Sequence, residues 1–147
     1  MLLIDAANVI GSRPDGWWRD RPGAARRFVD RVRGAVGAGT LAGPVVVVVE
    51  GAARRGVEAG ATGEVTVQHA PGSGDDRLLE VIAGADPPVR LVSADRALGR
   101  QARALGAEVV GPGWLLGILD HDGGGGHDRG GGDGGAGGDD GADTAKF

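Results

Sequence analysis

Acidic side chains stand at the ends of several short apolar runs in the sequence, and carboxylates in this position can do chemistry. The clearest cases are Asp5 after Leu2–Ile4, Glu50 after Val45–Val49, and Asp95 three residues after Val92. A pair, Asp75 and Asp76, also follows the apolar run Val65–Gln68, after the loop Pro71–Gly74. If the runs are parallel strands, their carboxyl ends lie at one edge of a sheet, where ligands bind in α/β folds.

Carboxylates that meet at one edge repel each other, and burying them without compensation is costly. A hard divalent cation relieves that repulsion, because Mg²⁺ and Mn²⁺ prefer oxygen ligands and retain water molecules. Such an ion can activate a water molecule and stabilise negative charge on a phosphate. The competing interpretation is that each Asp only caps the N-terminus of a helix. Both interpretations stay open for the Asp75-Asp76 pair taken by itself.

The apolar runs predict a mostly parallel sheet. They do not alternate with polar residues, which is typical of strands buried on both faces. Helical patterns lie between most of them, with Arg26, Asp30 and Arg33 opposite an apolar face in the first. Strands that alternate with helices predict an α/β fold with helices on both faces of the sheet. The five runs are Leu2–Ile4, Val45–Val49, Val65–Gln68, Val89–Val92 and Glu108–Val110, and the helical segments are Ala24–Val36, Asp75–Ala83, Arg96–Leu105 and Gly113–Leu119.

The composition divides the chain into a domain, residues 1–120, and a tail, residues 121–147. The tail holds twelve Gly and six Asp with almost no apolar side chains, so it cannot offset the entropy cost of ordering. We therefore expect it to be disordered. It also accounts for the whole net charge of −4, so the domain is neutral overall. The chain contains no Cys and no apolar run long enough to span a bilayer, so we expect a cytoplasmic protein without a membrane partner.

One segment of the domain is locally basic. Gly11–Arg33 contains seven Arg and three Asp, and it begins beside the predicted carboxylate edge. Arginine side chains bind phosphates, and aromatic side chains beside them stack on unpaired bases. We therefore expect an RNA-binding surface here; its members would be Arg13, Trp17, Trp18, Arg19 and Arg21. The alternative is that one Trp packs locally and Arg19 pairs with Asp20.

Several segments, taken in order, resemble the NYN domains, which are PIN-like nucleases that include the YacP-type RNA-processing proteins. The first, Leu3–Ile10, is similar to their opening pattern of a hydrophobic residue, Asp, two residues, Asn and a hydrophobic residue. The others resemble their second strand, their Asp-Asp helix start, their Ser-x-Asp strand end and their last strand and helix. In chain order these are Val46–Gly51, Gly72–Glu80, Val92–Arg96 and Ala107–Leu116.

The resemblance implies a Rossmann-like, three-layer domain with a five-stranded parallel sheet of order 3-2-1-4-5. It implies cleavage of RNA phosphodiester bonds that depends on Mg²⁺ or Mn²⁺. It makes Asp5, Asp76 and Asp95 the catalytic metal ligands, and Glu50 a further one whose side chain is a methylene longer than the Asp of many relatives. Asn8, Asp75 and Ser93 take supporting positions.

Three functions from different classes are compatible with these residues. The first is a metal-dependent endoribonuclease. The second is a phosphohydrolase of a small nucleotide, which a closed pocket sized for a base would favour over an open groove lined with Arg. The third is a non-catalytic RNA-binding module, which a failure to bind Mn²⁺ would favour. A homodimer is a further partner that the sequence leaves open.

Overall fold

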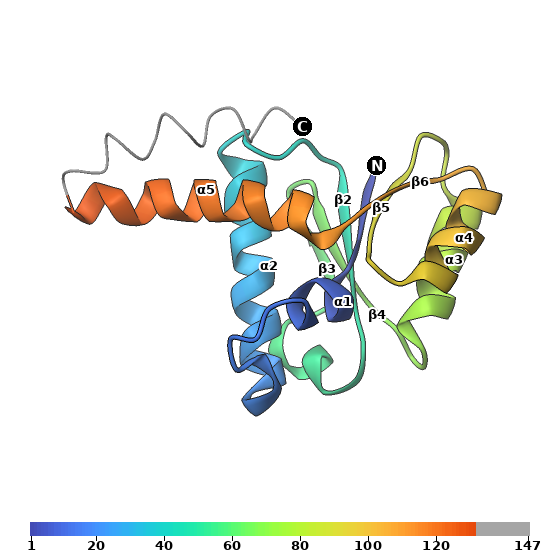
Figure 1. The fold of residues 1–147 in the computed structure, drawn as a ribbon, viewed down its shortest axis with the longest axis horizontal. Helices are drawn as coiled ribbons and strands as arrows, with labels where there is room; N and C mark the ends of the chain where they lie inside the picture. The colour runs from blue at the N-terminus through green and yellow to red at the C-terminus, as the bar shows by residue number, and fades with distance from the viewer. Residues whose placement is uncertain (132–147) are drawn as a thin grey trace.

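The computed structural model describes residues 1–131, and its centre is a six-stranded sheet of order β3-β4-β2-β1-β5-β6 (Figure 1). Five strands run parallel, and β3 pairs with β4 in the antiparallel direction. The strands are β1 (Leu2–Asp5), β2 (Val45–Val49), β3 (Gly60–Thr62), β4 (Val65–His69), β5 (Arg90–Val92) and β6 (Glu108–Val110). The five predicted strands and their predicted order are therefore confirmed.

The sixth strand, β3, is the difference from the prediction of a five-stranded, purely parallel sheet. It belongs to the segment Gly51–Gly63, whose sequence gave no clear pattern. All three of its residues are exposed, so no buried apolar run marks it. Gly63 has φ +59°, a backbone conformation that glycine adopts readily, and it turns the chain from β3 into β4.

Helices cover both faces of the sheet, as predicted (Figure 1). One face packs against α1 (Ala6–Gly11), α2 (Arg21–Gly37) and the start of α5 (Pro112–Gly131). Two short 3-10 helices, η1 (Trp17–Arg19) and η2 (Gly51–Gly56), contact α2 on this side. The other face packs against α3 (Gly74–Gly84) and α4 (Arg96–Ala104). Alternate residues of β1 serve the two faces: Leu2 and Ile4 belong to the first core, and Leu3 to the second.

The last helix is longer than the sequence predicts. We expected a helix over Gly113–Leu119 and a disordered tail from His121, but α5 continues to Gly131. Polar contacts hold its middle to the domain: Asp120 pairs with Arg13 and Arg31, and Thr40 donates a hydrogen bond to Asp122. The boundary expected at His121 is thus not where the helix ends. The rest of the predicted tail, 132–147, lies outside the described residues. None of the described helices has both the length and the apolarity needed to cross a bilayer.

The fold predicts that two leucines at α4 contribute very differently to the free energy of unfolding, one within the helix and one at its C-terminal end. Leu98 is fully buried under the sheet, whereas Leu105 at the helix end is 50% exposed. We expect Leu98→Ala to lower the free energy of unfolding by about 2–5 kcal/mol because it leaves a cavity. The matched change Leu105→Ala should cost less than about 0.5 kcal/mol. Urea denaturation measures both, and equal losses would contradict the packing of α4.

Candidate functional site

Asp5, at the end of β1, is the one acidic side chain that is buried among the described residues, with an exposed fraction of 5%. Both of its carboxylate oxygens accept hydrogen bonds. The Ser93 hydroxyl donates to Oδ2 over 2.9 Å, and the backbone N–H of Asn8 donates to Oδ1 over 3.4 Å. Asp5 therefore caps the N-terminus of α1 and is joined to the loop after β5.

Ser93 connects Asp5 with Asp95. Its hydroxyl oxygen accepts a hydrogen bond from the backbone N–H of Asp95 over 3.1 Å, while the same hydroxyl donates a hydrogen bond to Asp5. Asp95 in turn caps α4 by accepting from the N–H of Leu98 over 3.0 Å. Asn8 accepts from the N–H of Ala94 over 2.7 Å and fixes α1 to the same loop. Asp5 and Asp95 thus both cap helices, and their carboxylates lie at the same edge of the sheet, so capping does not by itself decide against a ligand role.

The charges at this edge act on one another. The pKa of Asp5 is raised to about 6, mainly by burial. Its two hydrogen bonds lower this pKa, and the charges of Asp75 and Glu50 raise it. Burial also raises the pKa of Asp75, with contributions from Asp95 and Asp76. Four carboxylates, those of Asp5, Glu50, Asp75 and Asp95, therefore lie at the carboxyl ends of neighbouring strands. We call them the carboxylate rim.

The two acidic residues that open α3 are not equivalent. The Ser73 hydroxyl accepts from the N–H groups of both Asp75 and Asp76, over 3.1 and 3.4 Å, and so fixes the start of the helix. Asp75 is half-buried and its pKa responds to Asp95, whereas Asp76 is exposed. The resemblance to NYN domains implies that Asp76 is a metal ligand and that Asp75 has a supporting role. The structure brings Asp75 toward Asp5 and Asp95.

Glu50 reaches the same helix start. A Cβ built on Gly74 would lie 2.0 Å from its Oε1, so the Glu50 carboxylate rests on the backbone where α3 begins. Only glycine at position 74 leaves room for Glu50 in this position. Sequence reasoning did not assign a role to Gly74, and the signal was its place directly before the Asp75-Asp76 pair.

The rim fits a divalent cation in charge and donor type. Buried or half-buried carboxylates raise each other's pKa, which is the situation that a cation relieves. The side chains do not form a ready-made cage, since no three His or acidic residues within the described part of the chain converge closely enough to ligate one ion. Mg²⁺ commonly uses one or two protein carboxylates and keeps its other ligands as water, so a cage is not required. One or two of Asp5, Asp75 and Asp95 could hold it directly, with water molecules between the ion and the remaining carboxylates.

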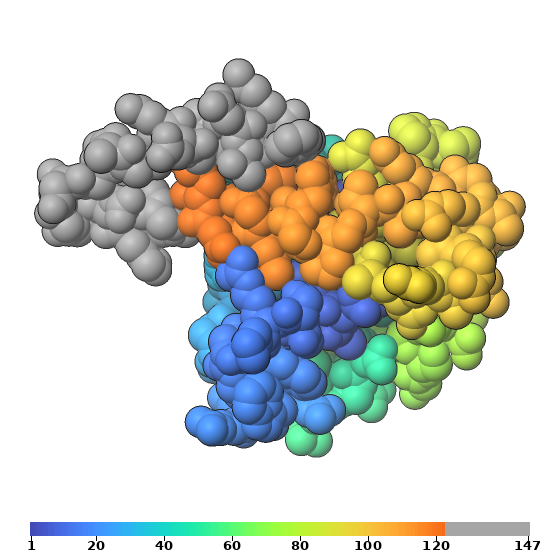
Figure 2. Space-filling view, viewed as in Figure 1, coloured from blue at the N-terminus to red at the C-terminus, as the bar shows by residue number. Residues whose placement is uncertain are grey.

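The structure divides the predicted RNA-binding residues. Two nitrogens of the Arg13 guanidinium donate hydrogen bonds to the two carboxylate oxygens of Asp120 in α5. Arg31 also donates to Asp120, over 2.8 Å. Arg13 is therefore engaged within the protein. The Arg13 hydrogen bond holds the pKa of Asp120 below its usual range. In Figure 2 the segment of Arg13 lies directly beside α5. The partner of Arg13 is 107 residues away, and no local pattern in the sequence announces it.

The remaining members of that surface form an aromatic and cationic group around η1. Trp17 and Trp18 meet edge to face with ring centroids 5.9 Å apart. The Arg21 guanidinium lies 5.2 Å from the Trp17 ring centre, and that of Arg19 lies 5.8 Å from the Trp18 ring centre. Trp18 is 49% exposed, which suits a contact with a partner. The predicted pairing of Arg19 with Asp20 is not formed; the Asp20 side chain instead caps α2 at the N–H of Gly23.

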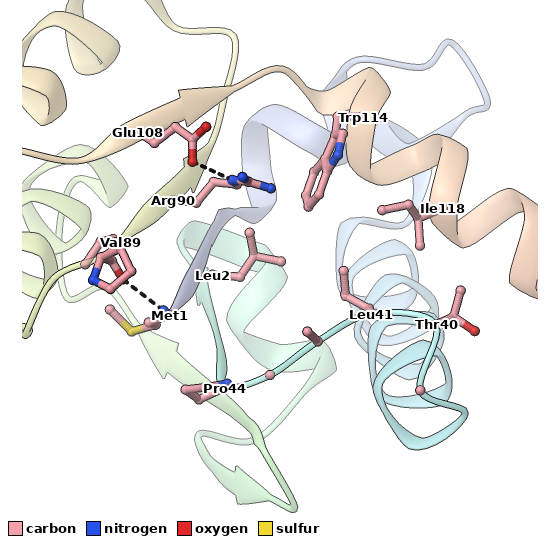
Figure 3. A pocket seen from close by; sticks show the side chains of 14 residues that line it. Met1, Leu2, Thr40, Leu41, Pro44, Val89, Arg90, Glu108, Trp114 and Ile118 are labelled. Carbon is pink, nitrogen blue, oxygen red and sulfur yellow. Dashed lines mark hydrogen bonds and ion pairs between the residues drawn. The ribbon is translucent and has the colours of Figure 1, made fainter. Parts of the chain in front are cut away.

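A separate cavity of about 500 Å³ lies at the opposite edge of the sheet, where β1 and β2 begin. Figure 3 shows the side chains that line it. It is lined by Leu2, Leu41, Trp114 and Ile118 and by the pair of Arg90 with Glu108, whose atoms are 2.8 Å apart. Arg90 also stacks on Trp114 at 5.1 Å. Its charged groups compensate each other, so this cavity lacks the repelling carboxylates of the rim.

Asp5 makes the stability of the metal-free protein depend on pH. Its pKa is about 6 in the folded state against 3.8 ordinarily, so folding favours the protonated form. The free energy of unfolding should fall by up to about 3 kcal/mol as pH rises from 4 to above 6. Asp5→Asn removes this contribution, and its stability relative to the parent should rise over that range. Urea denaturation in EDTA at pH 4 to 8 measures it; parallel pH profiles would contradict the buried charge.

No family model matches this sequence, and a search of curated proteins finds no match either. The structure is similar to the crystal structure of a point mutant of Rae1 (YacP) from Bacillus subtilis. The TM-score is 0.62 at 18% sequence identity, and the match covers 82% of this chain and 74% of that chain. At this identity the likeness concerns the fold. The comparison therefore shows that this chain shares the fold of Rae1 (YacP).

Proposed function

We propose that this protein is a metal-dependent endoribonuclease whose active site is the carboxylate rim. The observation that carries the proposal is Asp5, a buried carboxylate whose pKa is raised to about 6 by burial and by its acidic neighbours. Carboxyl groups whose pKa is strongly perturbed by burial and by neighbouring charges are typical of functional sites. The YacP-like fold supports the same conclusion.

A bound Mg²⁺ or Mn²⁺ would supply an activated water and charge compensation at the scissile phosphate. Asp5, Asp75 and Asp95 would hold it, directly or through water molecules. The Glu50 carboxylate lies against the backbone of Gly74, at the start of α3. Ser93 is a positioning residue, because its hydroxyl fixes the Asp5 carboxylate and the backbone of Asp95 together. Asn8 acts in the same way through Ala94. These hydrogen bonds hold the ligand oxygens in place before substrate arrives.

RNA is the proposed substrate because of what lies next to the rim. Trp18 is half-exposed, and the guanidinium of Arg19 lies over its ring. The guanidinium of Arg21 lies over the ring of Trp17. Aromatic rings and guanidinium groups stack on unpaired bases, and arginines contact phosphates. The resemblance to NYN domains implies RNA as well. We propose the cytoplasm as the compartment, and self-association stays a prediction.

A phosphohydrolase of a small nucleotide is the second candidate, and one observation bears on it. A cavity of about 160 Å³ adjoins Glu50, which is below the range of roughly 300–1,000 Å³ that small-molecule sites usually occupy. It has room for a base but not for a base, sugar and phosphates enclosed together. This size favours a polymeric substrate that lies mostly outside the cavity.

The two neighbouring acidic residues of α3 give the sharpest test. Incubation of labelled single-stranded RNA with Mn²⁺ should yield cleavage by the parent, and Asp75→Asn should reduce the rate by at least about 100-fold, since it removes a rim carboxylate. Asp76→Asn is the matched control. It makes the same change one residue further along, on an exposed side chain, and should retain cleavage within a few-fold.

The reverse pattern, with loss at Asp76 and activity kept at Asp75, would return the ligand role to Asp76 and contradict the role proposed for Asp75. Absence of any Mn²⁺-dependent cleavage in the parent would favour the RNA-binding module. Hydrolysis of nucleoside triphosphates without cleavage of RNA would favour the phosphohydrolase.

A further inference from the structure

The cavity of about 160 Å³ beside Glu50 lies between α1, η1 and η2. Its walls are mostly small and apolar, and the residues that matter here are Ala6, Ala7, Trp17, Arg21, Glu50 and Ala52. It adjoins the rim directly, because Ala6 follows Asp5 in the chain and Glu50 belongs to both.

The chemistry of the walls excludes a phosphate as the occupant. The single cation, Arg21, is stacked over the Trp17 ring at 5.2 Å, and Glu50 would repel an anion. A flat group with an apolar face suits the walls better. An indole ring and a guanidinium plane are the two surfaces on which unpaired bases stack.

Trp17 is presented to this space rather than absorbed into the core. A Cβ built on Gly11 would lie 3.6 Å from the Trp17 ring, so the ring rests on the end of α1. Trp17 also lines a second cavity, of about 240 Å³, on the side of Arg27 and Phe28. An aromatic ring with open space on two sides has surface left for a ligand.

We propose that this cavity is a subsite for one unstacked nucleobase of single-stranded RNA, which it holds so that the phosphate of the same nucleotide lies at the carboxylate rim. The inference rests on the proposed function for its substrate class. It adds a positioning role for α1, η1 and η2: the base is anchored at Trp17 and Arg21, and the backbone is thereby placed at Asp5. Such anchoring orients the reacting bond.

The test is RNA binding in EDTA, so that cleavage does not intervene. The probes are two fluorescein-labelled tetranucleotides, one with 2-aminopurine as its second base among uridines and one with an abasic position there. The parent should bind the abasic probe more weakly by roughly 5- to 150-fold, the value of one base stacked on an aromatic ring. The emission of 2-aminopurine should fall on binding.

Ala7→Leu fills the mouth of the cavity from an exposed helix position, where leucine is also a good helix former. It should weaken binding of the 2-aminopurine probe but leave binding of the abasic probe unchanged. Ala104→Leu is the matched control, an exposed alanine at the end of α4 outside the lining of the cavity. It should bind both probes like the parent. Thermal denaturation confirms that both variants fold.

Equal binding of the two probes by the parent would overturn the subsite, as would a loss in Ala7→Leu that is the same for both probes, or no binding at all. Mn²⁺-dependent cleavage by the same proteins separates the two proposals. Cleavage without an abasic penalty keeps the nuclease and removes the subsite. An abasic penalty without cleavage keeps the subsite and removes the nuclease.

Discussion

The buried carboxylate of Asp5 sets the arrangement of everything around it. It stands at the end of the central strand β1 and caps the start of α1. It also accepts a hydrogen bond from the hydroxyl of Ser93, which directly follows β5. Burial disfavours its charge, and Asp75 and Glu50 add repulsion. Two hydrogen bonds recover only part of this cost. The fold therefore keeps an uncompensated negative site at this edge, and under the proposed function a cation would supply the missing charge.

Much of this could be predicted from sequence because buried parallel strands leave a plain signal. Apolar runs located five strands, and their ends located Asp5, Glu50 and Asp95, since the carboxyl ends of parallel strands share an edge. The resemblance to NYN domains supplied the strand order. Capping by Asp5 and Asp95 proved compatible with a place at the rim, because a helix that follows a strand begins at that same edge.

The parts that the sequence missed or left open depend on contacts that no local pattern encodes. Successive helix residues point about 100° apart, so the choice between Asp75 and Asp76 depends on where the Ser73 cap starts α3. Arg13 is engaged by Asp120, far along the chain, and β3 lacks apolar residues. The glycine-rich composition after Leu119 argued against helix, but α5 packs through Leu115 and Ile118 and is anchored by Asp120 and Asp122.

A crystal structure of the protein soaked in Mn²⁺, with anomalous scattering data, tests the central claim most directly. The account predicts an anomalous peak at the carboxylate rim, with an oxygen of Asp5 bound to the ion or joined to it by one water molecule, and with Asp75 and Asp95 in the same shell. Manganese bound only elsewhere, with the rim carboxylates in their present positions and no peak between them, would contradict it.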